Sequence, residues 1–167
     1  MRRSLTNSQV RQILSAVDLR SLFGRRDYLL ILFLHETGLQ IGECSRLLIR
    51  LVSRNGVPFP SLALSPMFCK GSQDRVVPLS PLAQSCIEKM LQFNKEKGLS
   101  TSPAAPLFQN SKQCPLSPQA ILTLIHRYKA QSGLEIPTTP QVHHLEDYRE
   151  MASTSHSIKP AHQHLAG

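Results

Sequence analysis

The apolar positions near the N-terminus follow the period of an α-helix. A first helix is predicted to begin after Thr6 or Asn7, either of which can cap it. Its apolar positions are Val10, Ile13, Leu14 and Val17. A second helix is predicted at 25–37, and Gly38 suits the left-handed conformation that ends a helix. Because positions 29–34 are apolar on every side, we expect neighbouring elements to bury this helix completely.

The pattern between residues 41 and 79 changes from helical to strand-like. A short amphipathic helix is predicted at 41–48. Three short apolar runs follow it, at 50–52, 61–64 and 75–77, and turn residues separate them. Runs of this length between turn residues predict strands. We therefore expect a small three-stranded antiparallel sheet, whose middle strand is irregular because prolines lie close to it.

Helical periodicity returns after residue 80. Ser80-Pro81 and Ser117-Pro118 each place an N-capping serine before a proline at the first helical position. These two helices are expected to end near Gly98 and Gly133, with a connector rich in Pro and Ser between them. Thr139-Pro140 opens a last predicted helix.

Together these elements predict an α+β fold, mainly α, in which a helical domain packs around the small antiparallel sheet. The domain is expected to span residues 1–152. Residues 153–167 form a polar, His-rich tail that we expect to be disordered. The histidines in and before this tail predict no metal site, because no cysteine pair lies nearby and their spacing suggests no rigid ligand set.

Composition excludes several classes of protein. The chain has 167 residues, of which 41% are hydrophobic, so it is not a wholly disordered polypeptide. Its longest apolar run has seven residues, at 28–34, whereas a membrane span needs about 20. No secretory signal is visible at the N-terminus. The four cysteines lack the close spacing of zinc or redox motifs, and we expect reduced thiols in a cytoplasmic protein.

The charge is strongly basic and unevenly distributed. Nineteen Lys and Arg residues against eleven Asp and Glu give a formal net charge of +8. Such an excess favours a polyanionic partner, most simply nucleic acid. Residues 1–54 hold nine basic and four acidic residues, whereas residues 135–150 hold one basic and four acidic. If DNA is the partner, the segment 135–150 is the least suited to contact its phosphates through bulk charge.

Two stretches combine turn residues with candidate chemistry. The first, at 35–43, reads HETGLQIGE and passes from the buried helix through a glycine into the next helix. The second, at 69–80, reads CKGSQDRVVPLS, and Lys70-Gly71 marks a hairpin turn in it. A lysine at a hairpin tip is commonly only a solvated charge. On a basic domain it can instead enter a DNA groove or donate a proton to a leaving oxygen.

In this order the two stretches resemble the catalytic domain of the tyrosine recombinase (phage integrase) family. The family pattern T-G-L-R-x-G-E is matched at 37–43 except at its arginine. The pattern K-G-x-x-D-R-x-x-P-L is matched fully at 70–79. Residues 106–117 resemble the next family landmark, and Thr139-Pro140 is what usually precedes the family's His-x-x-Arg helix. The likeness covers about residues 5–145.

The resemblance implies DNA integration and strand exchange without a metal or any other cofactor. In this family a tyrosine hydroxyl attacks the scissile phosphate and forms a phosphotyrosyl intermediate. Two arginines and a histidine stabilise the negative charge of the transition state, and the hairpin lysine helps the leaving oxygen depart. Preformed cationic donors lower the energy of such a transition state, and arginine suits the task because its planar fork binds two oxygens.

Several family positions are occupied by other residue types. Lys70 stands at the expected lysine position. Gln40 occupies the position of the first arginine, Gln141 that of the histidine and His144 that of the second arginine. Glu43 matches the acid that usually orients the first arginine. The catalytic set implied by the resemblance is therefore degenerate at three positions.

No tyrosine matches the family's nucleophile. Tyr28 and Tyr128 lie in or beside apolar helical patterns and are expected to be core or half-core residues. Tyr148 lies one turn after the second arginine position, where the nucleophile is not expected. Lys70 and Arg75 of the hairpin are the predicted DNA contacts.

The sequence thus predicts a family member that does not cut DNA by itself, C-terminally truncated and degenerate. DNA is its expected partner, with an intact recombinase protomer as a second candidate, and neither a membrane nor a small-molecule cofactor is expected. Two alternatives stay open. The chain is a non-catalytic DNA-binding or recombinase-interacting module, or it is a non-functional pseudogene product.

Overall fold

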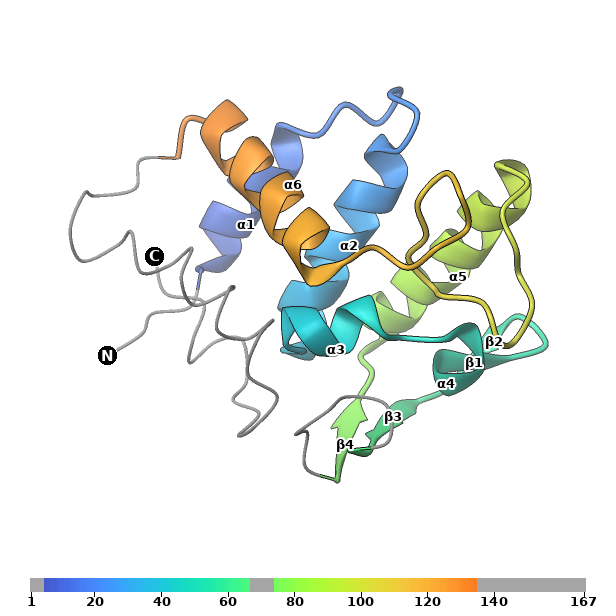
Figure 1. Ribbon diagram of the computed structural model, residues 1–167. Coiled ribbons are helices and arrows are strands. Elements are labelled where there is room, and N and C mark those ends of the chain that lie inside the picture. The colour runs from blue at the N-terminus through green and yellow to red at the C-terminus, as the bar shows by residue number, and fades with distance from the viewer. Residues whose placement is uncertain (1–4, 67–73, 135–167) are drawn as a thin grey trace.

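A computed structural model describes residues 5–66 and 74–134 (Figure 1). The chain runs through the elements α1 (Asn7–Ser15), α2 (Gly24–Thr37), α3 (Ile41–Ser45), α4 (Ile49–Val52), β1 (Ser53–Arg54), β2 (Val57–Pro58), β3 (Ser61–Leu64), β4 (Arg75–Pro78), α5 (Pro81–Glu96) and α6 (Pro118–Gln131). The predicted mainly helical α+β class is confirmed. The last predicted helix and the tail 153–167 lie outside the described residues, so the boundary at residue 152 stays a prediction.

The helices begin where their capping residues predict. The Thr6 side chain accepts a hydrogen bond from the Gln9 backbone N–H, and the Gln9 side chain accepts one from the Thr6 N–H. Ser80 and Ser117 cap α5 and α6 in the same position, each followed by proline. These side chains satisfy N–H groups that have no partner within the helix. Gly38 ends α2 with φ of 70°, a conformation that costs glycine little.

Helix α2 forms the centre of the molecule, as its uniformly apolar stretch predicts. Leu30 and Phe33 are 0% exposed. The helix packs against α1 and along α5, while α6 packs against α1 and α3 (Figure 1). The Phe33 ring lies 5.8 Å from that of Phe108, which comes from the connector between α5 and α6. The helix is buried over most of its surface, although Tyr28 and Leu32 are only half-buried, and the next turn leaves from its C-terminal end.

The single three-stranded sheet predicted from the sequence is wrong in detail. Within the described residues the strands form two separate antiparallel pairs, β1 with β2 and β3 with β4. The run 50–52, predicted as a strand, lies in α4. The connector explains this, because the Ile49 and Arg50 N–H groups donate to the Ala105 and Pro103 carbonyls, each at 2.9 Å. An apolar run of three residues carries no periodicity that separates a strand from a helical turn.

The second pair of strands carries the hairpin that the sequence singled out. Ser61 pairs with Pro78 and Leu64 with Arg75. Leu62 and Leu64 are buried and alternate with exposed residues, as expected of a strand with one face on the core. Another difference from prediction is the third helix, which ends at Ser45 and not at 48. In the described part of the chain, no helix is long and apolar enough to cross a membrane.

Candidate functional site

The start of α3 brings two predicted site residues together. After Gly38 ends α2, the chain turns and Gln40 becomes the N-cap residue of α3. The Gln40 side chain accepts a hydrogen bond from the Glu43 backbone N–H, and Glu43 Oε2 accepts one from the Gln40 N–H at 2.9 Å. Gln40 is 3% exposed and Glu43 is 2% exposed. The residue at the first arginine position is thus a buried cap of a helix.

Arg75, at the base of the hairpin, contacts the carboxylate of Glu43 that also accepts from Gln40. It is the first residue of β4, and its Nη2 atom lies 2.8 Å from Glu43 Oε2. The Glu43 side chain is 1% exposed, whereas the Arg75 side chain is 24% exposed. The family resemblance assigns Glu43 to the orientation of an arginine at position 40. Here an arginine from the hairpin pairs with that acid, and part of its side chain is accessible to solvent.

A second contact fixes the other end of the hairpin strand. Ser80, which follows β4 and caps α5, donates its hydroxyl to Glu36 Oε2 at 3.0 Å. Glu36 lies in the last turn of α2, just before the turn that leads to α3. Both ends of β4 are therefore tied by hydrogen bonds to the 36–43 region. The hydrogen bond from Arg75 to Glu43 has a charged donor and a charged acceptor, so it is stronger than a hydrogen bond between neutral groups.

The remaining predicted catalytic residues lie outside the described residues. These are Lys70, Gln141 and His144; Tyr148, at a position where the nucleophile is not expected, also lies outside them. Their assignments stay predictions. Of the other tyrosines, Tyr28 is half-buried on α2 and Tyr128 is 6% exposed on α6, so the expectation of core or half-core positions is confirmed for both.

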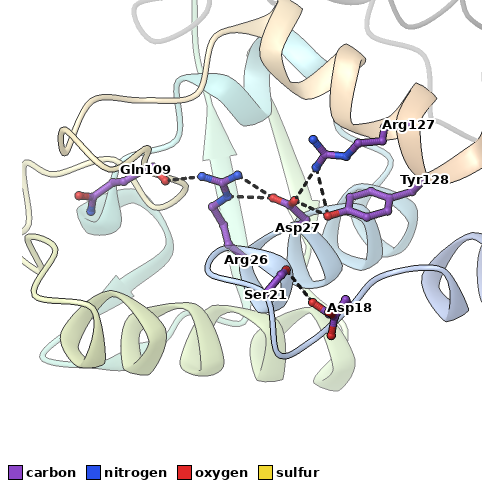
Figure 2. A network of polar contacts seen from close by, with 7 residues as sticks. All are labelled: Asp18, Ser21, Arg26, Asp27, Gln109, Arg127 and Tyr128. Atoms are coloured by element: carbon purple, nitrogen blue, oxygen red, sulfur yellow. Dashed lines mark hydrogen bonds and ion pairs between the residues drawn. The ribbon is translucent and has the colours of Figure 1, made fainter. Parts of the chain in front are cut away.

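Tyr128 belongs to a polar network around Asp27 that joins α2 to α6 (Figure 2). Asp27 Oδ2 accepts from the Tyr128 hydroxyl at 2.6 Å and from Arg127 Nη2 at 3.2 Å. Asp27 Oδ1 accepts from Arg26 Nε and Nη2, and Arg26 Nη1 donates to the Gln109 carbonyl at 3.0 Å. Asp27 is 2% exposed. Its charge is balanced by the buried Arg26 and by Arg127, whose side chain is 52% exposed, and the Tyr128 hydroxyl adds a hydrogen bond.

The network keeps Tyr128 in its protonated form. Burial raises the pKa of Tyr128, and its hydrogen bond to Asp27 raises it further. With its pKa raised, the Tyr128 hydroxyl forms little phenolate near neutral pH. The sequence analysis missed this network, and the available signal was weak. It consists of an Arg26-Asp27 pair at the front of an apolar helix and an Arg127-Tyr128 pair in a later one.

The described residues near the start of α3 combine a buried carboxylate with an arginine. Within 5–66 and 74–134, no three His, Cys, Asp or Glu residues are grouped as metal ligands. At the start of α3, the buried Glu43 carboxylate holds Arg75, whose side chain is 24% exposed. Arginine side chains suit phosphate oxygens because the guanidinium is planar and stays charged.

Comparisons with known proteins agree with this architecture. The model of the "Phage integrase family" matches residues 3–155. The tyrosine recombinase XerD of Xanthomonas axonopodis pv. citri is 32% identical over 150 residues, covering 86% of this chain and 47% of that protein. The chain therefore spans about half the length of this curated relative.

Two solved structures share the fold. The crystal structure of XerA recombinase superposes with a TM-score of 0.63 at 19% identity, covering 87% of this chain and 46% of that one. The XerH site-specific recombinase, bound to a palindromic difH substrate in a post-cleavage complex, gives 0.60 at 20% identity, with 87% and 40% covered. The family model and the sequence identity show that the chain belongs to the phage integrase family, with the fold of a tyrosine recombinase catalytic domain.

Proposed function

We propose that this chain binds DNA through the α3 and β3–β4 region and does not cleave it by itself. One observation carries the second half of the proposal. The side chain at the first arginine position, Gln40, is buried and caps α3. A buried, neutral amide supplies neither the positive charge nor the exposed donors that a phosphoryl transition state requires. Loss of one such donor costs about 10²–10³ in rate.

The proposal that the chain binds DNA is supported by its net charge and by its similarity to recombinases. The net charge is +8, and the XerH relative is seen with its DNA substrate. The partly exposed Arg75 belongs to the hairpin that matches the family pattern, and it pairs with Glu43 at the start of α3. The chain covers only part of the length of these relatives, so we do not assign their strand-exchange activity to it. The predicted Lys70 contact at the hairpin tip belongs to the same proposal.

The cleavage test uses nicked recombination-site DNA, which traps a covalent intermediate. The protein is incubated with the DNA and run on a denaturing gel, with intact XerD and its own site as the positive control. We expect a shifted band on a native gel and no denaturant-resistant adduct. A covalent adduct from this chain alone would contradict the inactive site, whatever its DNA affinity.

The binding test targets Arg75. Replacement by glutamine should weaken DNA binding about tenfold at low salt, since a phosphate contact that involves a charged group contributes about 1.5–3 kcal/mol. Arg75→Gln leaves Glu43 charged in a buried place, so the double variant Glu43→Gln/Arg75→Gln is measured beside it. The matched control is Arg20→Gln, whose side chain is 95% exposed on a distant loop. Equal affinity of the double variant and the control would refute the Arg75 contact.

A further inference from the structure

A hollow lies on the molecule at a place that the candidate site does not use. Its volume is about 720 Å³. It is formed by α4, by the β1–β2 turn, by the C-terminal part of α5 and by the start of the connector after α5. In Figure 1, α4, β1 and β2 lie to the right of α3, and the connector that leaves the end of α5 runs down toward them. Gln40, Glu43 and Arg75 are not among the residues that line it.

The hollow is cationic. Arg50, Arg54 and Lys95 line it, and all three side chains are exposed. They come from α4, β1 and α5, so the fold gathers them from three separate elements. No Asp or Glu is among the lining residues, and in the described part of the chain no carboxylate forms an ion pair with any of the three. No ion pair of the described residues relieves the repulsion among the three side chains, and a bound anion would relieve it.

The walls of the hollow are fixed by backbone hydrogen bonds. The Arg50 N–H donates to the Pro103 carbonyl at 2.9 Å, which ties α4 to the connector. The β1–β2 turn is closed by Asn55 and Gly56, with φ of 52° and 80°. The Phe59 N–H donates to the Val52 carbonyl at 2.8 Å and places its half-buried ring in the lining. The cations are thus carried by a rigid frame.

The lining combines charge with apolar and neutral polar groups. Phe59, Ile49 and Leu91 offer apolar surface, and the neutral polar residues are Ser53, Asn55, Gln92 and Thr101. Ligand hollows that bind small molecules measure about 300–1,000 Å³ and mix apolar surface with a few polar groups. A nucleotide has the matching chemistry, because its phosphates suit the guanidinium groups and its base suits an aromatic or guanidinium face.

We propose that this hollow is a second anion site, which binds the phosphate and base of a nucleotide, either free or within a DNA strand. The site lies beyond the proposed function, since its residues are separate from the α3 and β3–β4 region. If the source is DNA, the hollow would hold a strand at a distance from the hairpin. If the source is a free nucleotide, the site would act independently of DNA.

The test compares two triple variants with equal loss of charge. The hollow variant is Arg50→Gln/Arg54→Gln/Lys95→Gln. The control is Arg11→Gln/Arg20→Gln/Lys112→Gln, in which all three positions are exposed and none lines the hollow. Binding of ATP, inorganic triphosphate and a short single-stranded DNA is measured by calorimetry at low salt. Circular dichroism and urea titration check that both variants fold.

The expected result is a loss of at least about tenfold in the hollow variant and about twofold or less in the control, because localised charge pairs outweigh a change in net charge. Loss of ATP affinity identifies a free nucleotide, and loss of DNA affinity alone identifies a strand. Equal losses in both variants, or no binding of any probe by the wild-type chain, overturn the site. The Glu43→Gln/Arg75→Gln variant separates the two proposals, since it should weaken DNA binding and leave ATP binding unchanged.

Discussion

Lys129 is buried in α6 without a charged partner. It is 1% exposed, and within the described residues no carboxylate pairs with it. Burial lowers its pKa to about 8 from 10.5. The folded chain therefore binds the proton less tightly than the unfolded chain does. Below pH 8 both states are protonated and the penalty for the buried charge is complete, and as pH rises from about 8 to about 10.5 the penalty disappears.

Replacing Lys129 by methionine should stabilise the protein at neutral pH. We expect the free energy of unfolding to rise by about 1–3 kcal/mol at pH 7, since one pKa unit corresponds to about 1.4 kcal/mol. The gain should vanish above the unfolded pKa of lysine. Urea titrations of variant and wild type across this pH range measure the difference. Lys112→Met, at an exposed position, is the control, and a gain that does not depend on pH would contradict the buried charge.

Gly24 is required by a close approach of the backbone. A Cβ atom added there would lie 1.9 Å from the Asp18 carbonyl oxygen and 2.6 Å from Ser21 Oγ. The Ser21 hydroxyl also donates to that carbonyl at 2.7 Å (Figure 2). The backbone must shift to admit a methyl group, because the nearest atom is not the end of a flexible side chain.

Gly24→Ala should therefore lower the free energy of unfolding by about 1–3 kcal/mol, the usual cost of an overpacked position. The measurement is a urea titration, with Ser8→Ala at an exposed position of α1 as the control. Removing the Ser21 side chain in the same chain should restore only a minor part of the loss. Full recovery in the double variant would place the clash on the serine and not on the backbone.

At the scale of elements, the Asp27 network joins α2, α6 and the connector. Asp27→Ala would leave Arg26 buried without its acid and the Tyr128 hydroxyl without its acceptor. Breaking a buried ion pair by removing one partner costs about 3–5 kcal/mol. Tyr128→Phe removes the hydroxyl's two hydrogen bonds, one to Asp27 and one from Arg127, and should cost about 1–2 kcal/mol. Urea unfolding of both variants measures these losses, and equal losses would show that the charges contribute nothing beyond the hydroxyl.

The elements themselves differ in how far the sequence predicts them. The starts of α1, α5 and α6 were correct because Thr6, Ser80 and Ser117 act on N–H groups within the next three residues, a local interaction. The run 50–52 was predicted as a strand and is helical. Its state depends on carbonyls of the connector some fifty residues away, which local pattern does not contain.

At the scale of the whole molecule, the net charge of +8 predicts a strong dependence of DNA binding on salt. If three phosphates are neutralised, raising the salt from about 50 to about 200 mM should weaken binding about 40-fold through the release of counterions. Fluorescence anisotropy of a labelled duplex at several salt concentrations gives the slope. Affinity that is independent of salt would mean that the basic residues do not contact phosphates.

The sequence by itself determined the family, the helical class and the residues at the family positions. These follow from motifs, caps and periodicity, which are local properties of the chain. Only the tertiary structure decided which of these residues contact one another and which are buried. It showed that Gln40 is a buried cap and that Arg75 pairs with Glu43 across 32 positions. It also brought Lys95 of α5 to the same hollow as Arg50 and Arg54, because packing joins segments that are far apart along the chain.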